Sequence, residues 1–264
     1  MTTPPDTASD LTVVKLGGST LGAHDTSLHD IAAARREGRR IVVVHGGGAA
    51  ISAWLARMGI EASFVRGLRV TDAASLDVVV AVLAGLVNKQ LVAELGAFGA
   101  PAIGLSGADG LVLQARRYDD ELGFVGKIHQ VNPAPLEELL RLGYLPVIAP
   151  IAIDTSGLAS SQLLNTNADT AAGEIAAALH AERLVFLTDV DAVLDAEKRP
   201  LAHLTPDKAT ELIASGAAAG GMIPKLEAAV RAAGAGCATR IVNGTAAGAL
   251  ARVLAGDAAG TTVG

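Results

Sequence analysis

The sequence predicts an α/β fold in which helices cover both faces of a mainly parallel sheet. The first observation behind this prediction is the alternation of short β-branched runs with amphipathic helical stretches along the chain. The second is the run Ile-Val-Val-Val at 41–44, which is typical of a strand buried on both faces. The third is that glycines end the runs 12–16 and 41–45, as in the strand–turn–helix units of parallel sheets.

The composition limits the class of protein. Hydrophobic residues make up 50% of the 264 residues and the mean hydropathy is +0.41, mostly because Ala and Val are abundant. The longest apolar run, 78–87, ends at Asn88 and is shorter than the roughly 18 residues of a spanning helix, so we expect a buried helix and no membrane association. A net charge of −6 without a long basic run argues against a nucleic-acid partner.

The two ends of the chain and its cysteine usage give further expectations. Residues 1–10 lack the basic start and apolar core of a signal peptide, and we expect a disordered tail before one domain at 11–264. The single cysteine, Cys237, cannot form an internal disulfide and lies in an apolar run. This pattern favours a cytoplasmic protein with a buried thiol at that position.

The elements follow from local patterns taken in order. Strands are expected at 12–16, 41–45, 101–105, 145–149, 162–164, 183–188 and 239–242. Helices are expected at 28–37, 49–57, 72–98, 135–142, 170–180, 206–214, 220–233 and 246–254. Asp72 is a suitable N-cap for the longest of these helices. The segment 61–71 is expected to be irregular or a hairpin, and 111–131 to form hairpins at a sheet edge.

The glycine turn at 46–48 is the strongest candidate for an anion site. It joins a buried strand to a helix start, where free N–H groups point outward and glycine lets a ligand approach the backbone closely. The alternative is a tight turn between strand and helix that binds nothing.

Two cationic side chains follow strand patterns. Lys15 stands at the end of a buried strand beside Gly17 and Gly18, where a lysine is costly unless it meets an anion; the alternative is that it extends to the surface. Arg69 can hold a carboxylate with two parallel N–H bonds, although composition alone favours a surface arginine.

Two polar clusters stand at helix starts. Asn165-Thr-Asn-Ala-Asp169 has more polar residues than a single cap requires, and Asp169 can order nearby lysines by charge pairing. Lys225 follows Pro224 in the first turn of a predicted helix and can reach back over its N-terminus, although a surface lysine is the ordinary alternative. Both clusters are expected at the sheet edge where open α/β sheets bind ligands.

Several common site motifs are missing from the sequence. It has no Walker loop, no Gly-x-Gly-x-x-Gly after a strand and no Gly-x-Ser-x-Gly elbow. Its single Cys and six scattered His offer no metal-ligand spacing, so no protein-held metal site is expected.

The segments described above, in the order in which they follow one another along the chain, resemble the amino acid kinase family from Val13 to near Gly260. The match covers almost the whole chain and, as a set, is highly specific. The motifs that carry it are Lys15–Gly18, His45–Gly48, Gly67–Asp72, Gly85–Lys89, Gly104–Gly110, Leu122–Gly126, Gly143–Pro150, Asn165–Asp169, Leu187–Asp191 and Gly221–Lys225.

The resemblance implies an αβα sandwich that phosphorylates the side-chain carboxylate of N-acetyl-L-glutamate with ATP, the second step of arginine biosynthesis, with Mg²⁺ bound with the nucleotide. It implies an acyl-substrate lobe at about 11–180 and an ATP lobe at about 181–264. By position, Lys15 and Lys225 would stabilise the transition state and Asp169 would hold them. The acyl substrate would bind to Gly47, Gly48, Arg69 and Asn165. The nucleotide would bind to Gly17, Gly18, Asp189, Val190, Asp191, Ala192, Val193, Leu194, Ala217, Ala218 and Ala219.

One position departs from the family and two other functions stay open. The family commonly has glycine where this chain has Ala192, and a methyl group there alters the loop beside the nucleotide. One alternative is a kinase for a related acyl amino acid such as N-acetyl-aminoadipate. The other is a non-catalytic ligand sensor on the same fold, which should have lost the two lysines.

The resemblance also bears on assembly. Arginine-inhibited relatives have an extra N-terminal helix that links dimers into a hexamer, and Pro4-Pro5 disfavours a helix in this chain. We therefore expect a homodimer without strong arginine inhibition, with the helix at 72–98 as its interface.

Overall fold

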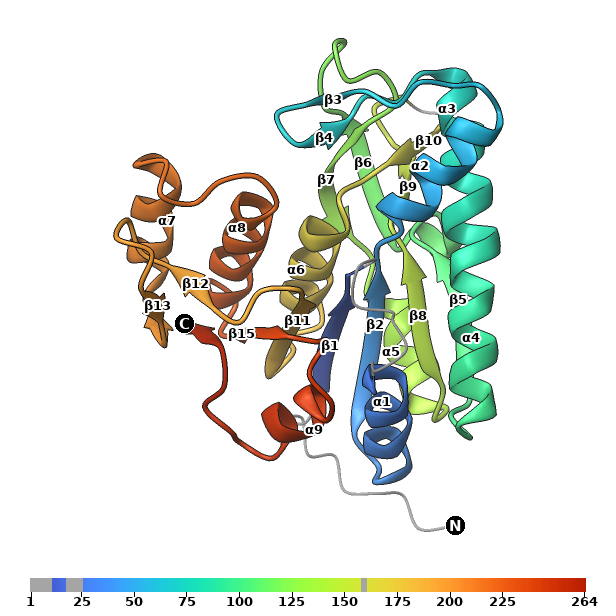
Figure 1. The fold of residues 1–264 in the computed structure, drawn as a ribbon. Helices are drawn as coiled ribbons and strands as arrows, with labels where there is room; N and C mark the ends of the chain where they lie inside the picture. The colour runs from blue at the N-terminus through green and yellow to red at the C-terminus, as the bar shows by residue number, and fades with distance from the viewer. Residues whose placement is uncertain (1–10, 18–25, 158–160) are drawn as a thin grey trace.

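A parallel sheet forms the centre of the molecule in the computed structural model, which describes residues 11–17, 26–157 and 161–264 (Figure 1). The predicted disordered tail at 1–10 lies outside these ranges. Within them, the large sheet has eight strands in the order β14-β16-β15-β11-β1-β2-β8-β5. Its pairings are parallel except that of β15 with β16. The strands are β1 (Leu11–Leu16), β2 (Arg40–His45), β5 (Ala102–Ser106), β8 (Leu145–Ala149), β11 (Arg183–Thr188), β14 (His203–Leu204), β15 (Ala238–Asn243) and β16 (Thr261–Val263).

The central strands are buried because helices cover both faces of the sheet. Ile41, Val42, Val43 and Val44 have no exposed surface, which confirms the predicted doubly buried strand. The side chains of this strand alternate between two separate clusters of buried apolar residues, one on each face. The sheet is thus the middle layer of an αβα sandwich, as expected.

The helices divide between the two faces. Residues of α1 (Ser27–Arg36), α2 (Gly48–Arg57), α3 (Ala73–Val80), α4 (Asn88–Ala97) and α9 (Ala249–Leu254) pack in one cluster. The other cluster receives residues from α5 (Ala134–Arg141), α6 (Ala168–Ala178), α7 (Pro206–Ala214) and α8 (Met222–Ala233). The predicted helices begin and end within about three residues of these bounds, because capping and breaking residues mark helix ends locally.

The longest helical run extends from Ala73 to Ala97 as α3, the π-helical turn η1 (Ala81–Val87) and α4. Its predicted cap is confirmed, since Asp72 Oδ1 accepts a hydrogen bond from Ser75 N at 2.8 Å. By length and composition this run would be able to cross a membrane, with a mean hydropathy of 1.7. One side of it lies in the core, as expected from the sequence, with Leu83 and Leu95 buried.

A second sheet lies beyond the carboxyl ends of the central strands, in the upper part of Figure 1. Its order is β10-β9-β6-β7, and β6 and β7 form the antiparallel pair predicted for 111–131. The strands are β6 (Leu113–Arg117), β7 (Gly126–Val131), β9 (Ile151–Asp154) and β10 (Leu163–Asn165), and a hairpin of β3 (Phe64–Val65) and β4 (Leu68–Arg69) lies beside them.

The sequence did not predict β9, which is four residues long, nor that β10, β9, β6 and β7 form one sheet, because pairing between distant strands is not a local property. It also missed β14, β16 and the pair β12 (Val193–Leu194) and β13 (Pro200–Leu201). The remaining short helix is the 3₁₀ turn η2 (Asp109–Leu111). Cys237 is buried as predicted, and burial raises the pKa of its thiol to about 12.

Candidate active site

The glycine turn joins the end of β2 to the first residue of α2. Gly46 N donates to Leu16 O at 3.0 Å, which ties the turn to the end of the neighbouring strand β1. A Cβ on Gly47 would lie 2.6 Å from Leu83 Cδ2, whereas a Cβ on Gly48 would meet nothing within 4 Å. The turn therefore packs closely against the long helix on one side and faces open space on the other.

Arg69 lies beside this turn and is only 7% exposed, so the surface arginine that composition favours is wrong. Its Nη2 donates to Gly48 O at 3.0 Å and to Ser52 Oγ at 2.8 Å, and its guanidinium stacks on Phe64. Its Nη1 is buried and has no hydrogen-bond partner among the described residues. Burial lowers the pKa of Arg69, yet an arginine stays charged in proteins, so this nitrogen is a free donor for an anion.

A cavity of about 180 Å³ contains these groups. The four residues predicted to bind the acyl substrate, from three separate parts of the chain, all line it: Gly47, Gly48, Arg69 and Asn165. Asn165 Nδ2 donates to the buried hydroxyl of Thr71 at 3.1 Å, which orients the amide at the wall. The structure thus brings the predicted anion site and the predicted arginine together.

Asp169 lies in the first turn of α6 and holds two lysines. The helix is capped by Asn167, whose Oδ1 accepts from Asp169 N at 2.8 Å and Thr170 N at 3.0 Å. Lys15 Nζ lies 2.7 Å from one carboxylate oxygen, and Lys225 Nζ lies 3.1 Å from the other. The side chains are 9%, 8% and 13% exposed for Lys15, Asp169 and Lys225, so the predicted charge pairing occurs in a largely desolvated cluster.

Close packing of α6 and α8 sets the position of Lys225. A Cβ on Gly173 would lie 2.8 Å from Ala228 Cβ and 2.9 Å from Ala228 O. Gly173 follows Asp169 by one helical turn, and Ala228 follows Lys225 by about one turn. The two helices therefore touch one turn below the ion pair, and the absent side chain at 173 lets the ammonium reach the carboxylate.

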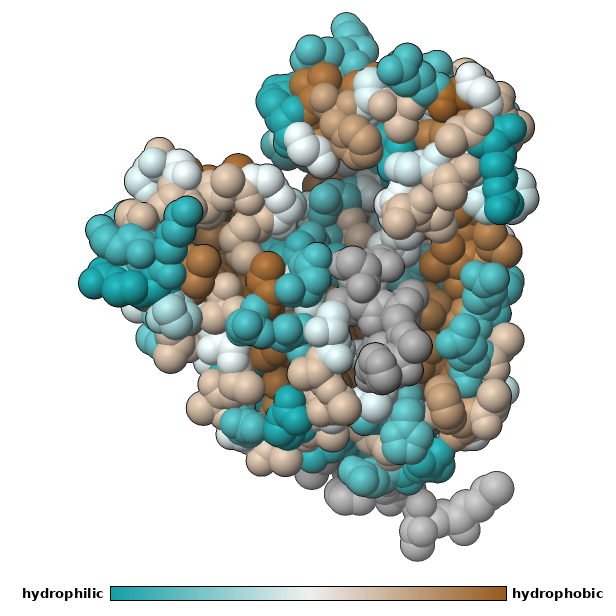
Figure 2. Space-filling model, viewed as in Figure 1, coloured by the Kyte–Doolittle hydropathy of each residue, from teal (hydrophilic) through white to brown (hydrophobic). Residues whose placement is uncertain are grey.

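A second cavity of about 550 Å³ opens beside Asp169. It shares Gly67, Leu68, Val125 and Asn167 with the first cavity, and Asp169, Gly220 and Gly221 also line it. In Figure 2, a hollow separates the part formed by the β3–β4 hairpin from the part formed by α7 and α8. The two cavities therefore adjoin, and of the lysine–carboxylate cluster Asp169 lines the larger one.

Three residues that line the larger cavity were not predicted from the sequence as site residues: Arg66, Tyr118 and Lys127. They are exposed residues on or beside short strands, and no local pattern separates them from ordinary surface residues.

The residues predicted to bind the nucleotide are spread over several parts of the structure, unlike those predicted to bind the acyl substrate. Gly17 follows β1 beside Lys15, and Gly18 lies outside the described residues. Ala217, Ala218 and Ala219 directly precede the glycines that line the larger cavity. Asp189, Val190, Asp191 and Ala192 form the turn after β11, and Val193 and Leu194 form β12. Of these, Asp191 lines a separate cavity of about 230 Å³, and Val193 and Ala218 are buried in the core.

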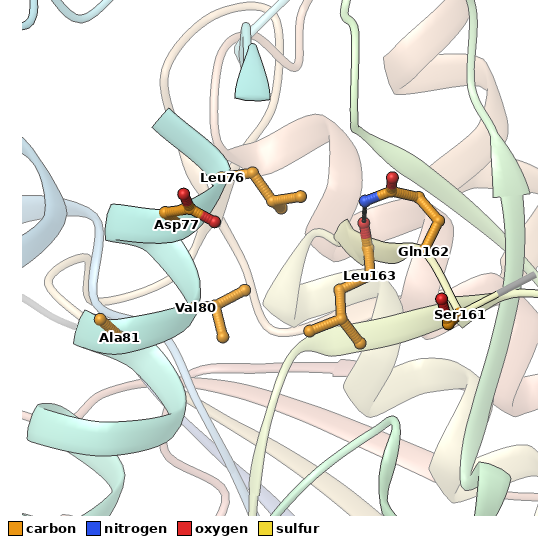
Figure 3. A pocket seen from close by; sticks show the side chains of 7 residues that line it. All are labelled: Leu76, Asp77, Val80, Ala81, Ser161, Gln162 and Leu163. Carbon is orange, nitrogen blue, oxygen red and sulfur yellow. Dashed lines mark hydrogen bonds between the residues drawn. The ribbon is translucent and has the colours of Figure 1, made fainter. Parts of the chain in front are cut away.

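One cavity away from the lysines differs in chemistry. It has a volume of about 500 Å³ and lies between α3 and β10 (Figure 3). It is lined by apolar side chains, Asp77 and two polar residues, and no lysine or arginine is among the described residues that line it. It therefore offers no cation for a phosphate or a carboxylate substrate.

Comparison with known proteins gives one consistent family. The model described as amino acid kinase family matches residues 10–243. The chain is 46% identical over 258 residues to an acetylglutamate kinase of Dehalococcoides mccartyi, a match that covers 97% of this chain and 95% of that protein. It is 45% identical over 240 residues to an acetylglutamate kinase of Synechococcus elongatus, covering 88% and 78% of the two chains.

Among solved structures, an N-acetylglutamate synthase of Neisseria gonorrhoeae, complexed with coenzyme A and N-acetyl-glutamate, superimposes with a TM-score of 0.82 and 27% identity. That match covers 96% of this chain and 59% of the synthase. Since the family model and these relatives each span most of the sequence, the chain belongs to the amino acid kinase family.

Proposed function

We propose that this protein phosphorylates the side-chain carboxylate of N-acetyl-L-glutamate with ATP, giving ADP and the acyl phosphate. The observation that carries the proposal is the meeting of Lys15 and Lys225 on Asp169, near the cavity lined by Arg69, whose Nη1 has no partner among the described residues. The acetylglutamate kinases at about 45% identity over most of the chain support it.

The acyl substrate would occupy the smaller cavity, in a lobe at about 11–180. Arg69 would hold a carboxylate through its unpartnered Nη1, because a buried charged donor gains most from an anionic partner. The N–H groups of Gly47 and Gly48 at the start of α2 would bind the reacting end, and Asn165 would bind the polar acyl or carboxylate oxygens.

The chemistry needs charge neutralisation more than proton transfer. ATP and the acyl substrate together carry about six negative charges near pH 7, and the attacking carboxylate, with a pKa near ~4.3, is already ionised. One carboxylate oxygen forms a bond to the terminal phosphorus while the bond to the leaving ADP oxygen breaks. Lys15 and Lys225 would neutralise charge on the transferring group from two sides, and Asp169 would hold both ammonium groups in place.

The nucleotide would bind in a lobe at about 181–264, with Gly17, Gly18, 189–194 and 217–219 around it. Among the described residues, no group of three or more His, Cys, Asp or Glu side chains is placed so that it could hold a metal ion. We propose that Mg²⁺ binds with the nucleotide, where it would neutralise phosphate charge.

ADP release measured with different acceptors tests this function. We expect turnover with N-acetyl-L-glutamate and much less with glutamate, aspartate, carbamate or N-acetyl-aminoadipate. Faster turnover with N-acetyl-aminoadipate would favour the related kinase. ATP turnover that does not depend on any acyl acceptor would remove the proposal, and tight binding without turnover would favour a sensor.

The setting we propose is a cytoplasmic homodimer that binds small molecules rather than nucleic acid or membranes. The long helix 73–97 supports a dimer, because its outer side exposes apolar residues such as Ala81 and Leu86.

A further inference from the structure

Two fully buried polar side chains lie directly beneath the glycine turn. His45 ends β2 and is 1% exposed, and Asn88 begins α4 and is 0% exposed. Asn88 Nδ2 lies 3.1 Å from His45 Nε2, and His45 Nδ1 lies 2.8 Å from Gly46 O. An amide nitrogen can only donate, so Nε2 accepts and Nδ1 carries the hydrogen that it donates to the carbonyl.

The network continues through groups that are all satisfied. Asn88 Nδ2 also donates to Val147 O at 2.9 Å, and Asn88 Oδ1 accepts from Lys89 Nζ at 3.0 Å. Lys89 Nζ donates to Gly104 O at 2.9 Å. A Cβ on Gly104 would lie 2.0 Å from Asn88 Oδ1, so only glycine leaves room for this pair. The network therefore links the long helix to strands β2, β5 and β8.

The imidazole in this position is neutral. Burial and the nearby Lys89 ammonium lower the pKa of His45 to about 4, although the bond to Gly46 O opposes them. Protonation would place an N–H at Nε2 against the donating amide of Asn88. The arrangement is therefore consistent with one fixed tautomer near neutral pH.

We propose that His45 is a positioning residue that fixes the peptide between Gly46 and Gly47. In a trans peptide, C=O and N–H point in opposite directions. Because Nδ1–H holds Gly46 O toward the buried imidazole, the Gly47 N–H points the other way, toward the cavity that Gly47 lines. Both flanking residues are glycines, whose backbones turn over at little steric cost, so a side chain has to supply the orientation.

Two matched variants test the two hydrogen bonds of the imidazole one at a time. The kinetic part of this test rests on the proposed function. His45→Asn keeps a donor at the position of Nδ1, and His45→Gln keeps an acceptor at the position of Nε2. We expect His45→Gln to lower kcat/KM for N-acetyl-L-glutamate at least about tenfold with little change in the KM for ATP. We expect His45→Asn to stay within about threefold of the wild type.

Equal loss in both variants, or a change only in thermal stability, would overturn the role. Crystal structures of the two variants show the orientation of the Gly46–Gly47 peptide directly. A Gly46 carbonyl that points away from residue 45 in His45→Gln supports the proposal, and an unchanged orientation contradicts it. The ¹⁵N spectrum of the wild-type imidazole needs no variant, and hydrogen on Nε2 instead of Nδ1 would also contradict it. If the wild type fails to phosphorylate N-acetyl-L-glutamate, the proposed function falls, while these last two measurements still decide the role of His45.

Discussion

Asp169 lies between two lysines, and the three side chains together carry one net positive charge. A buried ammonium without a partner is costly, so the carboxylate stabilises both lysines before any substrate binds. Each lysine contacts a different oxygen, which keeps the two ammonium groups apart. At the residue scale the site is thus prepared for a highly anionic pair of substrates.

Replacement of Lys225 by alanine tests its part in the chemical step. We expect Lys225→Ala to lower kcat by on the order of 10²-fold or more, because one of two charges on the transferring group is lost. The KM for N-acetyl-L-glutamate should change little. Steady-state kinetics check this, with Lys208→Ala as control, since Lys208 pairs only with the exposed Glu211 in the described contacts. Normal turnover in Lys225→Ala would remove this residue from the mechanism.

Arg69 gives a contrasting prediction at the same scale. Arg69→Ala should raise the KM for N-acetyl-L-glutamate about 10- to 100-fold, the equivalent of one hydrogen bond to a charged group. Arg69→Lys should not restore it, because a single ammonium cannot also bond to Gly48 O and Ser52 Oγ. An unchanged KM would contradict the carboxylate-binding role, and Arg141→Ala on the exposed surface serves as control.

Because the pKa of His45 is lowered in the folded chain, we expect the free energy of unfolding to depend on pH. Its folded pKa of about 4 lies below the ordinary value of 6.5, so between these values the unfolded chain binds more protons than the folded one. The stabilisation from keeping it neutral is complete above about pH 6.5 and is lost as the pH falls toward 4. From pH 7 to pH 5, His45 should account for about 2 kcal/mol of the loss in unfolding free energy.

Chemical denaturation at the two pH values checks this contribution. His45→Asn cannot titrate, and its unfolding free energy should fall by correspondingly less between pH 7 and pH 5. An identical fall in the variant and the wild type would assign the pH dependence to other groups.

At the scale of elements, the contact between α6 and α8 decides how Lys225 reaches Asp169. The contact at Gly173 involves the Cβ and the backbone of Ala228, so a new methyl group has no flexible side chain to displace. The helices must separate instead, and the distance from Lys225 to Asp169 must change.

Gly173→Ala should therefore lower kcat by about 10- to 100-fold, since a displacement near 1 Å is enough for such a loss. Gly96→Ala is the matched control, because Gly96 is also helical and a Cβ there meets nothing within 4 Å. This control should keep its kcat and gain about 0.5–1 kcal/mol of stability. Kinetics and thermal unfolding of both variants measure the difference, and wild-type kcat in Gly173→Ala would refute the packing argument.

At the scale of the whole molecule, the long helix gives a prediction about assembly. Leu86 is 37% exposed on its outer side, and Leu86→Glu should shift the proposed dimer toward monomer in light scattering. Leu142→Glu is the control, because Leu142 is 55% exposed but lies after α5 on the other face of the sheet. A wild-type monomer or hexamer, or inhibition by low concentrations of arginine, would contradict the expected assembly.

Much of the site was predictable because its signals are local. The doubly buried strand at 41–44, the glycine turn after it and the cap at Asp72 each depend on a few consecutive residues. The burial of Arg69 was not predictable, because a two-residue strand has no period and its cover comes from Phe64 and Ser52. Arg66, Tyr118 and Lys127 were missed because, as exposed residues, they show no local pattern that separates them from the ordinary surface.

By itself the sequence determined the helices and the longer strands to within about three residues, the parallel character of the main sheet and the motifs of the family. Only the tertiary structure decided that Lys15 and Lys225 share one carboxylate, that Arg69 and the glycine turn line one cavity, and that a second sheet closes it. The reason is physical: periodicity and capping are properties of neighbouring residues, whereas these contacts follow from strand order and helix packing. Residues more than two hundred positions apart meet only when the whole core is formed.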